Sequence, residues 1–297
     1  MKTYPLFLFY QAGILCLTSL FSGCNSRNHE AETTNIKDSL QYTPVTFTAM
    51  GDVPYTPQGF IDLAEQIEKH DGNSTSSFIM HLGDIKTSAD SCNERRYQEV
   101  ANVLQKSSIP LFIIPGDNEY NDCDDPIEAF AFWKKYFLHF HKKWAFPHAI
   151  EYDKERVENF SWVQEDVLFI AINLVGGRVY DSLEWNDRLR QDADWVEQSV
   201  NRHESGVKAL VLFGHAFITD DTMGKFTLFT DRFRQIAKAF NKPVLYLQGD
   251  GHVYIHDRPW PEANILRVQV DAGPRLMEVT VDTKQQDPFI FRKDMFP

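Results

Sequence analysis

Five short apolar runs in this chain each end in a Gly-Asp or Gly-His pair. The runs read TFTAMGD, IMHLGD, LFIIPGD, LVLFGH and LYLQGDGH, and they end at Asp52, Asp84, Asp117, His215 and His252. Short apolar runs bounded by turn residues are typical of buried strands, and ligands of open α/β sheets gather at the carboxyl ends of strands. We therefore expect five strands to bring carboxylates and imidazoles to one edge, where rigid elements can hold metal ions.

Strands and helices alternate along most of the chain. Amphipathic helices are expected near 57–69, 94–106, 127–140, 183–203 and 228–240. This alternation predicts parallel pairing, whereas 160–164 with 167–174 reads as an antiparallel pair, and 265–270 with 276–281 as a closing hairpin. The prediction is an α/β fold with two mixed β-sheets packed face to face and flanking helices. The domain spans residues 44–284, and residues 285–297 form a C-terminal extension.

The length of 297 residues suits one large α/β domain, and a hydrophobic content of 43% is enough for a sizeable core. The formal net charge of −12 argues against broad binding to nucleic acid or to anionic lipid. A local pocket for a phosphate group remains compatible with this charge.

The first 23 residues are predicted to be a signal peptide of the lipoprotein type. Lys2 precedes an apolar stretch from Pro5 to Leu20, and two small residues stand just before Cys24. This arrangement resembles a bacterial lipobox, in which Cys24 carries a lipid; an ordinary signal peptide and an uncleaved anchor are the alternatives. The polar residues 24–43 read as a flexible tether. We therefore expect export to the periplasm or cell envelope, with a membrane anchor at Cys24.

Export favours a disulfide between Cys92 and Cys123. Cys92 follows Asp84 by eight residues, and Cys123 follows Asp117 by six. Both loops are expected at the same sheet edge, and disulfides persist in oxidising compartments. Two free buried thiols are the alternative. Metal ligation by cysteine is disfavoured because the sequence contains no C-x-x-C spacing.

The order of the strand-end motifs resembles that of the calcineurin-like metallophosphoesterases. In that family the series runs G-D-x-H, G-D-x-x-D, G-N-H-D/E, a strand-end histidine and G-H-x-H. Here it reads Gly51-Asp52-Val53-Pro54, Gly83-Asp84-Ile85-Lys86, Gly116-Asp117-Asn118-Glu119, Gly214-His215 and Gly249-Asp250-Gly251-His252. The match in order and spacing covers about residues 45–252. No single motif is specific, but five in order form a strong joint signal.

The resemblance implies two divalent metal ions held by six side chains: Asp52, Asp84, Asp117, His215, Asp250 and His252. Asp84 stands in the position that bridges the two ions, and Asp52 and His252 would hold the first. Asp117 replaces the family asparagine, and Asp250 replaces the first histidine of the last motif. In an alternative register, His252 is that first histidine and Tyr254 takes the second place.

Two departures from the family pattern affect the chemistry. Pro54 replaces a metal-binding histidine. The related purple acid phosphatases also lack that histidine and use a tyrosine three residues beyond the bridging aspartate, where this chain has Thr87; Tyr55 is a candidate substitute. Asn118 replaces the histidine that stabilises the transition state or protonates the leaving group, so Asn118 is a candidate catalytic residue in a site with weaker turnover.

Lys86 is a second candidate catalytic residue. It stands two residues past Asp84, where its charge can offset the carboxylates or hold a phosphate oxygen. An exposed loop lysine is the alternative. His81, inside an apolar run, is expected to be a core residue with satisfied hydrogen bonds.

Four carboxylates and two neutral imidazoles would give the two ions a ligand charge of −4. Such a shell weakens the Lewis acidity of the ions. It also favours harder ions such as Mn²⁺, Mg²⁺ or Ca²⁺, while Fe and Zn stay open.

The resemblance thus implies an exported metal-dependent phosphoesterase. A hydroxide activated by the dinuclear centre would attack a phosphate mono- or diester. Without the family histidine, substrates with good leaving groups, such as nucleotides or aryl esters, are favoured. One alternative is a catalytically weak or inactive metal- or phosphate-binding lipoprotein of the same fold, and another is a hydrolase of sulfate or acyl esters.

Overall fold

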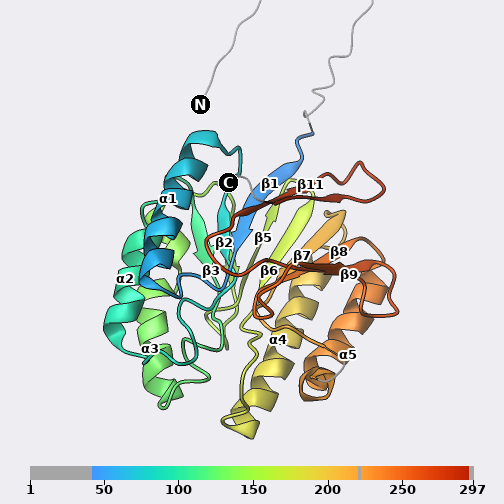
Figure 1. Cartoon of the computed structure of the whole chain (residues 1–297). Coiled ribbons are helices and arrows are strands. Elements are labelled where there is room, and N and C mark those ends of the chain that lie inside the picture. Colours follow the sequence, from blue (N-terminus) through green and yellow to red (C-terminus); the bar gives the residue numbers. More distant parts are fainter. Residues whose placement is uncertain (1–41, 220–221, 294–297) are drawn as a thin grey trace, which may run out of the picture. The chain divides into compact units, whose positions relative to one another are not determined.

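Two mixed β-sheets form the centre of the fold, and helices cover their outer faces (Figure 1). The computed structural model describes residues 42–219 and 222–293. The predicted signal peptide 1–23, Cys24 and most of the tether 24–43 lie outside the described residues. Within the described part of the chain, no helix is long and apolar enough to cross a membrane.

The first sheet is built from β1 (Val45–Met50), β2 (Ile79–His81), β3 (Leu111–Ile113), β11 (Met277–Val281) and β12 (Phe289–Arg292). Its strand order is β12-β11-β1-β2-β3. The strands β1, β2 and β3 are parallel, whereas β11 pairs antiparallel with β1. The carboxyl ends of β1, β2 and β3 therefore meet at one edge of the sheet.

The second sheet is built from β4 (Glu151–Tyr152), β5 (Phe160–Gln164), β6 (Val167–Ala171), β7 (Ala209–Phe213), β8 (Val244–Gln248), β9 (Ile255–Asp257) and β10 (Ile265–Gln269). Its order is β4-β5-β6-β7-β8-β10-β9. The strands β6, β7, β8 and β10 are parallel. The predicted antiparallel pair is confirmed as β5 and β6.

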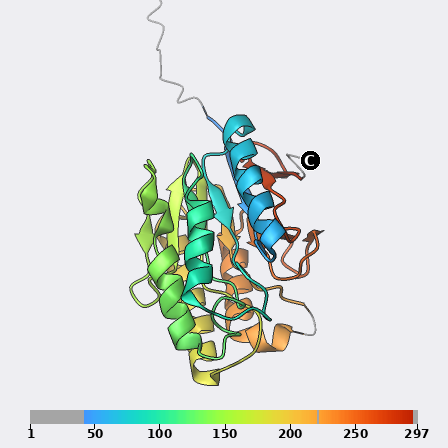
Figure 2. The ribbon, with the colours of Figure 1, turned by 60° about the vertical axis from the view of Figure 1, so that its left-hand side comes forward.

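Five helices cover the sheets: α1 (Pro57–Asn73), α2 (Glu94–Leu104), α3 (Pro126–Phe137), α4 (Ser182–His203) and α5 (Met223–Phe240). All five are predicted from the sequence, with ends that differ by a few residues. Figure 2 shows α1, α2 and α3 side by side over the first sheet, whereas α4 and α5 pack on the second. A short 3-10 helix, η1 (Phe140–Lys143), follows α3.

Side chains alternate between two cores along the buried strands. In β7, Val211 and Phe213 enter the core between the two sheets, whereas Leu210 and Leu212 enter the core under α4 and α5. A strand that is buried on both faces reads as a continuous apolar run. This explains why the apolar runs in the sequence are uninterrupted.

The predicted closing hairpin is wrong. β10 belongs to the second sheet, between β8 and β9, while β11 belongs to the first, between β1 and β12. All residues of β10 are buried, as in a central strand, whereas β11 alternates between buried and half-buried residues. The connection between them crosses from one sheet to the other through Gly273, whose φ of +97° is readily adopted by glycine.

The C-terminal extension is more ordered than the sequence indicates. Phe289–Arg292 forms β12, which pairs antiparallel with β11 at the edge of the first sheet. Its alternation of half-buried and exposed residues is weak as a sequence signal because only one face of this edge strand packs on the fold.

Candidate metal centre

The predicted ligands lie directly after five parallel strands from both sheets. Asp52, Asp84 and Asp117 follow β1, β2 and β3, His215 follows β7, and Asp250 and His252 follow β8. Ligand atoms of Asp52, Asp84 and His215 all lie within 4.8 Å of one another, and the same holds for Asp117, His215 and Asp250. The structure therefore brings five of the six predicted ligands into two overlapping clusters, with His252 at the margin.

Several of these residues have a left-handed backbone. The φ angles are 56° for Asp52, 61° for Asp84, 69° for Asp250 and 65° for His252. Such angles are costly for residues with a Cβ and persist where the surrounding structure holds them, often at functional sites. These backbone angles thus lower the stability of the fold, and they turn the side chains toward the site at the strand ends.

The glycines of two motifs allow the backbone to come close to a predicted ligand. A Cβ at Gly116 would overlap Asp84 Oδ1, and a Cβ at Gly249 would lie 2.7 Å from Asp52 Oδ2. These distances leave no room for a methyl group. At these two positions glycine is therefore required by packing against the neighbouring loop.

The tautomer of His215 is set by its surroundings. Its Nδ1 donates to the carbonyl oxygen of Leu82 at 2.6 Å, so Nε2 of the neutral ring is free to bind a metal. Nε2 lies 3.1 Å from Asp117 Oδ1 and 3.3 Å from Asp84 Oδ1. Burial opposes the charged form, but these carboxylates outweigh it and raise the pKa of His215 well above its ordinary value.

Two buried atoms at this point have no hydrogen-bond partner among the described residues. They are Asp117 Oδ1 and His215 Nε2, which face each other without the alignment of a hydrogen bond. Both atoms can coordinate a divalent cation through a lone pair. Unpaired buried polar atoms are costly, so the pair fits a metal ion better than it fits a purely structural role.

Burial also disfavours the ionised form of these carboxyl groups when no cation is present. It raises the pKa of Asp84 well above the usual range and raises the pKa of Asp250. Asp84 accepts from the Asn118 backbone N–H at 3.0 Å and from Asn118 Nδ2 at 2.5 Å. Buried carboxylates of this density need either protons or metal ions, and the residues present fit a site for divalent cations.

Lys86 is buried, with 1% of its side chain surface exposed, so the alternative of an exposed loop lysine is wrong. Its Nζ donates to the carbonyl oxygens of Thr87 and Asp90, both at 2.9 Å. Burial lowers the pKa of Lys86, while the charges of Glu119 and Asp84 oppose that effect. The ammonium group is thus held within its own loop, and a contact with a phosphate stays a prediction.

Glu119 is a buried carboxylate to which sequence reasoning assigned no role. It accepts from the backbone N–H of Asp84 at 3.0 Å and from that of Gly116 at 2.6 Å. It therefore ties the loop after β2 to the loop after β3. Its place at the end of the third motif is the signal that could have drawn attention to it.

Tyr55 points into the first cluster. Its hydroxyl lies within hydrogen-bond distance of two carboxylate oxygens that its single proton can serve, Asp52 Oδ1 at 3.2 Å and Asp84 Oδ2 at 3.1 Å. Burial and these carboxylates raise the pKa of Tyr55. The neighbouring His252 is half exposed, and its Nε2 lies 3.4 Å from Asp52 Oδ1.

Tyr254, the residue of the alternative register, has other contacts. Its ring lies 4.0 Å from the Lys293 ammonium group, and its backbone N–H donates to Asp271. The clustering of Asp250 with Asp117 and His215 favours the register in which Asp250 takes the first place of the last motif.

Two other predictions are confirmed. Cys92 and Cys123 form a disulfide, with Cα atoms 6.0 Å apart, that joins the loops following Asp84 and Asp117. His81 is a core residue with both ring nitrogens paired: Nε2 donates to Val53 O at 2.9 Å, and Nδ1 accepts from the backbone N–H of Gly83 at 3.2 Å. Burial lowers the pKa of His81 to about 4, so the ring is neutral.

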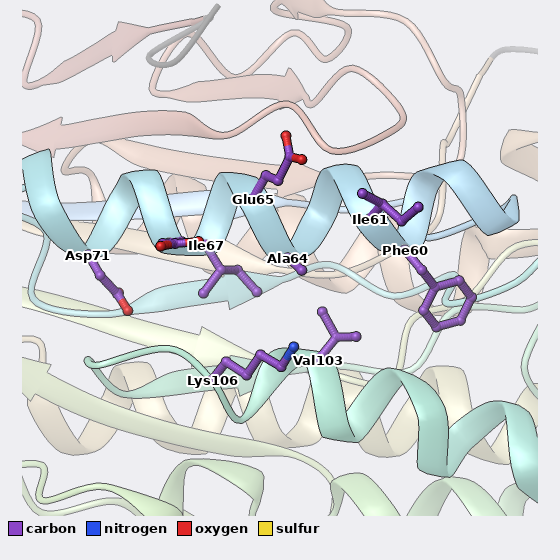
Figure 3. A pocket seen from close by; sticks show the side chains of 9 residues that line it. Phe60, Ile61, Ala64, Glu65, Ile67, Asp71, Val103 and Lys106 are labelled. Atoms are coloured by element: carbon purple, nitrogen blue, oxygen red, sulfur yellow. The ribbon is translucent and has the colours of Figure 1, made fainter.

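A groove of about 560 Å³ lies elsewhere, between α1 and α2. Figure 3 shows Ile67 and Ala64 of α1 on one side, Val103 and Lys106 on the other, and Asp71 toward one end. None of the six predicted ligands lines this groove. We therefore do not assign it to the metal centre.

Comparisons with known proteins identify the family of the chain and the fold. The model of the family described as calcineurin-like phosphoesterase matches residues 45–255. No curated protein matches the chain.

Three solved structures share the fold. A dimetal phosphatase from Danio rerio has a TM-score of 0.56 and 10% identity, over 80% of this chain and 96% of that one. GAP50, the anchor in the inner membrane complex of Plasmodium, has a TM-score of 0.52 and 12% identity, over 85% and 89%. A 5'-nucleotidase from Candida albicans has a TM-score of 0.51 and 11% identity, over 84% of this chain and 50% of that one. At these identities the likeness shows the fold alone.

Proposed function

The chain belongs to the calcineurin-like phosphoesterase family, and on this premise we propose that it hydrolyses phosphate mono- or diesters with two divalent metal ions. The observation that supports the proposal most is a cluster of buried carboxylates around His215, in which Asp117 Oδ1 and His215 Nε2 lie 3.1 Å apart and neither has a hydrogen-bond partner among the described residues. A fold of this kind gains nothing structurally from such a cluster, because it raises the free energy of the metal-free state.

The residues that would hold the ions are the six predicted ligands: Asp52, Asp84, Asp117, His215, Asp250 and His252. When bound, divalent ions would supply Lewis acidity and a nucleophile derived from water. Asp84 belongs to the first cluster; its Oδ1 lies 3.3 Å from Nε2 of His215, the residue that the two clusters share, and its Oδ2 faces Tyr55. Its position is consistent with the bridging role.

The neighbours of Asp84 orient it. Asn118 donates to both of its carboxylate oxygens, and Glu119 accepts from its backbone N–H. We assign Asn118 to the positioning of Asp84 and to donating a hydrogen bond to a phosphate oxygen when substrate displaces that contact. Lys86 acts through its charge. The carboxylates of Glu119 and Asp84 are close enough to raise the pKa of Lys86, so its charge is close enough to act on them.

The proposed substrates are phosphate esters with good leaving groups, such as nucleotides and aryl esters. The family histidine could deliver a proton to a departing alkoxide, whereas the amide of Asn118 cannot. Leaving groups of low pKa need no such proton. The fold is shared with a 5'-nucleotidase, which makes nucleotides a reasonable first choice.

A second candidate is a metal-binding protein with little or no turnover. It is supported by Pro54 and Asn118, which remove two family histidines, and by the commitment of the Asn118 amide to Asp84. A protein whose name describes it as an anchor shares the fold. The two candidates differ in turnover rather than in metal binding.

We also propose export and lipidation at Cys24. The sequence before Cys24 supports this, as does the Cys92–Cys123 disulfide, since disulfides persist mainly in oxidising compartments. Mass spectrometry of the N-terminal peptide from membranes, with Cys24→Ala as control, tests it. An unmodified N-terminus at Met1 in the membrane fraction would contradict lipidation.

The catalytic proposal is tested with bis(p-nitrophenyl) phosphate and p-nitrophenyl phosphate. The protein is assayed after metal removal and after reloading with Mn²⁺, with metal content measured on the same samples. We expect about two ions per chain and metal-dependent hydrolysis that Asp84→Ala abolishes. Asp231→Ala, which removes an exposed carboxylate from α5, is the matched control and should behave as wild type. Two bound ions without turnover would favour the second candidate, and p-nitrophenyl sulfate and acetate would test the other ester classes.

A further inference from the structure

Tyr55 lies next to Pro54, which cannot bind a metal because its side chain is a hydrocarbon ring. The phenolic oxygen of Tyr55 lies 3.2 Å from Asp52 Oδ1, 3.1 Å from Asp84 Oδ2 and 3.4 Å from His252 Nε2. These are donor atoms of three residues assigned above to the first metal. We propose that Tyr55 is the fourth protein ligand of that ion, an inference that rests on the proposed dinuclear site.

The loop that carries Tyr55 is held on both sides. Before it, the backbone N–H of Asp52 donates to Gly83 O at 3.0 Å, and His81 donates to Val53 O at 2.9 Å. After it, Thr56 caps α1 by accepting from the N–H of Gly59 at 3.0 Å. A side chain between two fixed points is oriented before a ligand arrives, which is what a metal site needs.

The packing of the ring supports the same orientation. The Tyr55 ring meets the His252 ring edge to face, with centroids 5.7 Å apart, and the hydroxyl is turned toward the two carboxylates rather than toward solvent. A tyrosine that served only to fill space would not need its polar atom at the point where three predicted ligands converge.

With Tyr55 included, each ion has four protein ligands. Asp52, Asp84, His252 and Tyr55 would surround the first, and Asp84, Asp117, His215 and Asp250 the second. On binding, the phenolic O–H bond breaks, an oxygen–metal bond forms, and the proton passes to solvent. The competing role is that of a neutral hydrogen-bond donor that merely positions Asp52 and Asp84, and it predicts no change in the phenol when metal binds.

The test titrates Zn²⁺, which does not absorb in the near ultraviolet, into the metal-free full chain. Calorimetry reports the number and affinity of the ions, and ultraviolet difference spectroscopy reports ionised tyrosine. We expect two ions per chain, with one equivalent of ionised tyrosine appearing as one of them binds. In Tyr55→Phe this signal should vanish, and the affinity for one ion should fall at least tenfold. Tyr254→Phe is the matched control and should keep both properties.

Two further measurements separate the possible failures. Circular dichroism of metal-free Tyr55→Phe establishes that the variant is folded, and Tyr55→His should restore affinity without the tyrosine signal. An unchanged ultraviolet spectrum in wild type, or equal affinities in wild type and Tyr55→Phe, would overturn the inference even if the protein hydrolyses esters. Conversely, two ions with the Tyr55 signal but no hydrolysis would support the inference and contradict the proposed function.

Discussion

The buried carboxyl of Asp192 on α4 should make the stability of the protein fall as the pH rises. Asp192 is fully buried; its Oδ1 accepts from Asn159 Nδ2 at 2.8 Å, and its Oδ2 has no hydrogen-bond partner among the described residues. Burial raises the pKa of Asp192 to about 7, although the charge of Arg156 and the hydrogen bond from Asn159 work against this.

The sign of the effect follows from the protons bound in each state. The unfolded chain releases the Asp192 proton near its ordinary pKa of about 3.9, whereas the folded protein keeps it until about pH 7. Between these values the folded state binds more protons, so the free energy of unfolding decreases as pH rises and then levels off above the folded pKa. At about 1.4 kcal/mol per pKa unit, the total is about 4 kcal/mol, of which about 2.5 kcal/mol falls between pH 5 and pH 8.

The assay compares urea unfolding of metal-free wild type and Asp192→Asn from pH 5 to pH 8. Asparagine has nearly the same shape and can still accept from Asn159, so the variant removes only the titration. Other groups titrate equally in both proteins. The difference in unfolding free energy between wild type and Asp192→Asn therefore isolates the contribution of Asp192. Wild type should lose about 2.5 kcal/mol more than the variant. Asp187→Asn, at an exposed position of the same helix, should retain the wild-type slope. Equal slopes in wild type and Asp192→Asn would show that the buried carboxyl is ionised in the folded protein and that the reasoning is wrong.

Three other predictions concern the site and the core. Replacing both Cys92 and Cys123 by serine should cost about 3.5 kcal/mol in urea unfolding, because the bridge closes a loop of 31 residues; a loss below about 1 kcal/mol would contradict this chain-entropy account. Gly116→Ala should lower metal affinity at least tenfold in calorimetry, since its Cβ would overlap Asp84; wild-type affinity would mean that the loops can separate freely. Trp162→Ala should destabilise the fold by about 3–5 kcal/mol in urea unfolding, because the ring is buried between the sheets; a loss of unfolding free energy under about 1 kcal/mol would indicate that the core closes around the gap.

Much of the fold could be predicted because its strands are buried on both faces. The runs at β7 and β8 are short, apolar and end in Gly-His or Gly-Asp pairs, so both their type and their ends are visible in the sequence. Edge strands lack this signal: β12 alternates between half-buried and exposed residues. The pairing of β10 with β8 rather than with β11 depends on which sheet each strand joins, and sequence proximity alone favours a hairpin.

The candidate site was likewise predictable only in part. The Gly-Asp series predicts that Asp52, Asp84 and Asp117 lie at neighbouring strand ends, and the structure has them there, because a parallel sheet brings the ends of its strands together. It did not reveal that the Lys86 ammonium group is held by loop carbonyls, nor that Glu119 joins two loops through backbone N–H groups. Those contacts arise from how irregular loops pack against each other, and loop packing has no periodic pattern that a sequence can display.

The ligands come from strands of two different sheets, and this has a consequence for the life of the protein. Without cations, the join between the sheets is held at this point only by contacts such as those of His215 with Asp84 and Asp117, and the buried carboxyls there need protons. Under the proposed assignment each bound ion would hold both sheets at once, and each ion present at a hundred times its dissociation constant would add about 2.7 kcal/mol to stability. Metal supply would then set how much of the protein survives proteolysis, so a cell short of metal would lose the protein itself along with its activity.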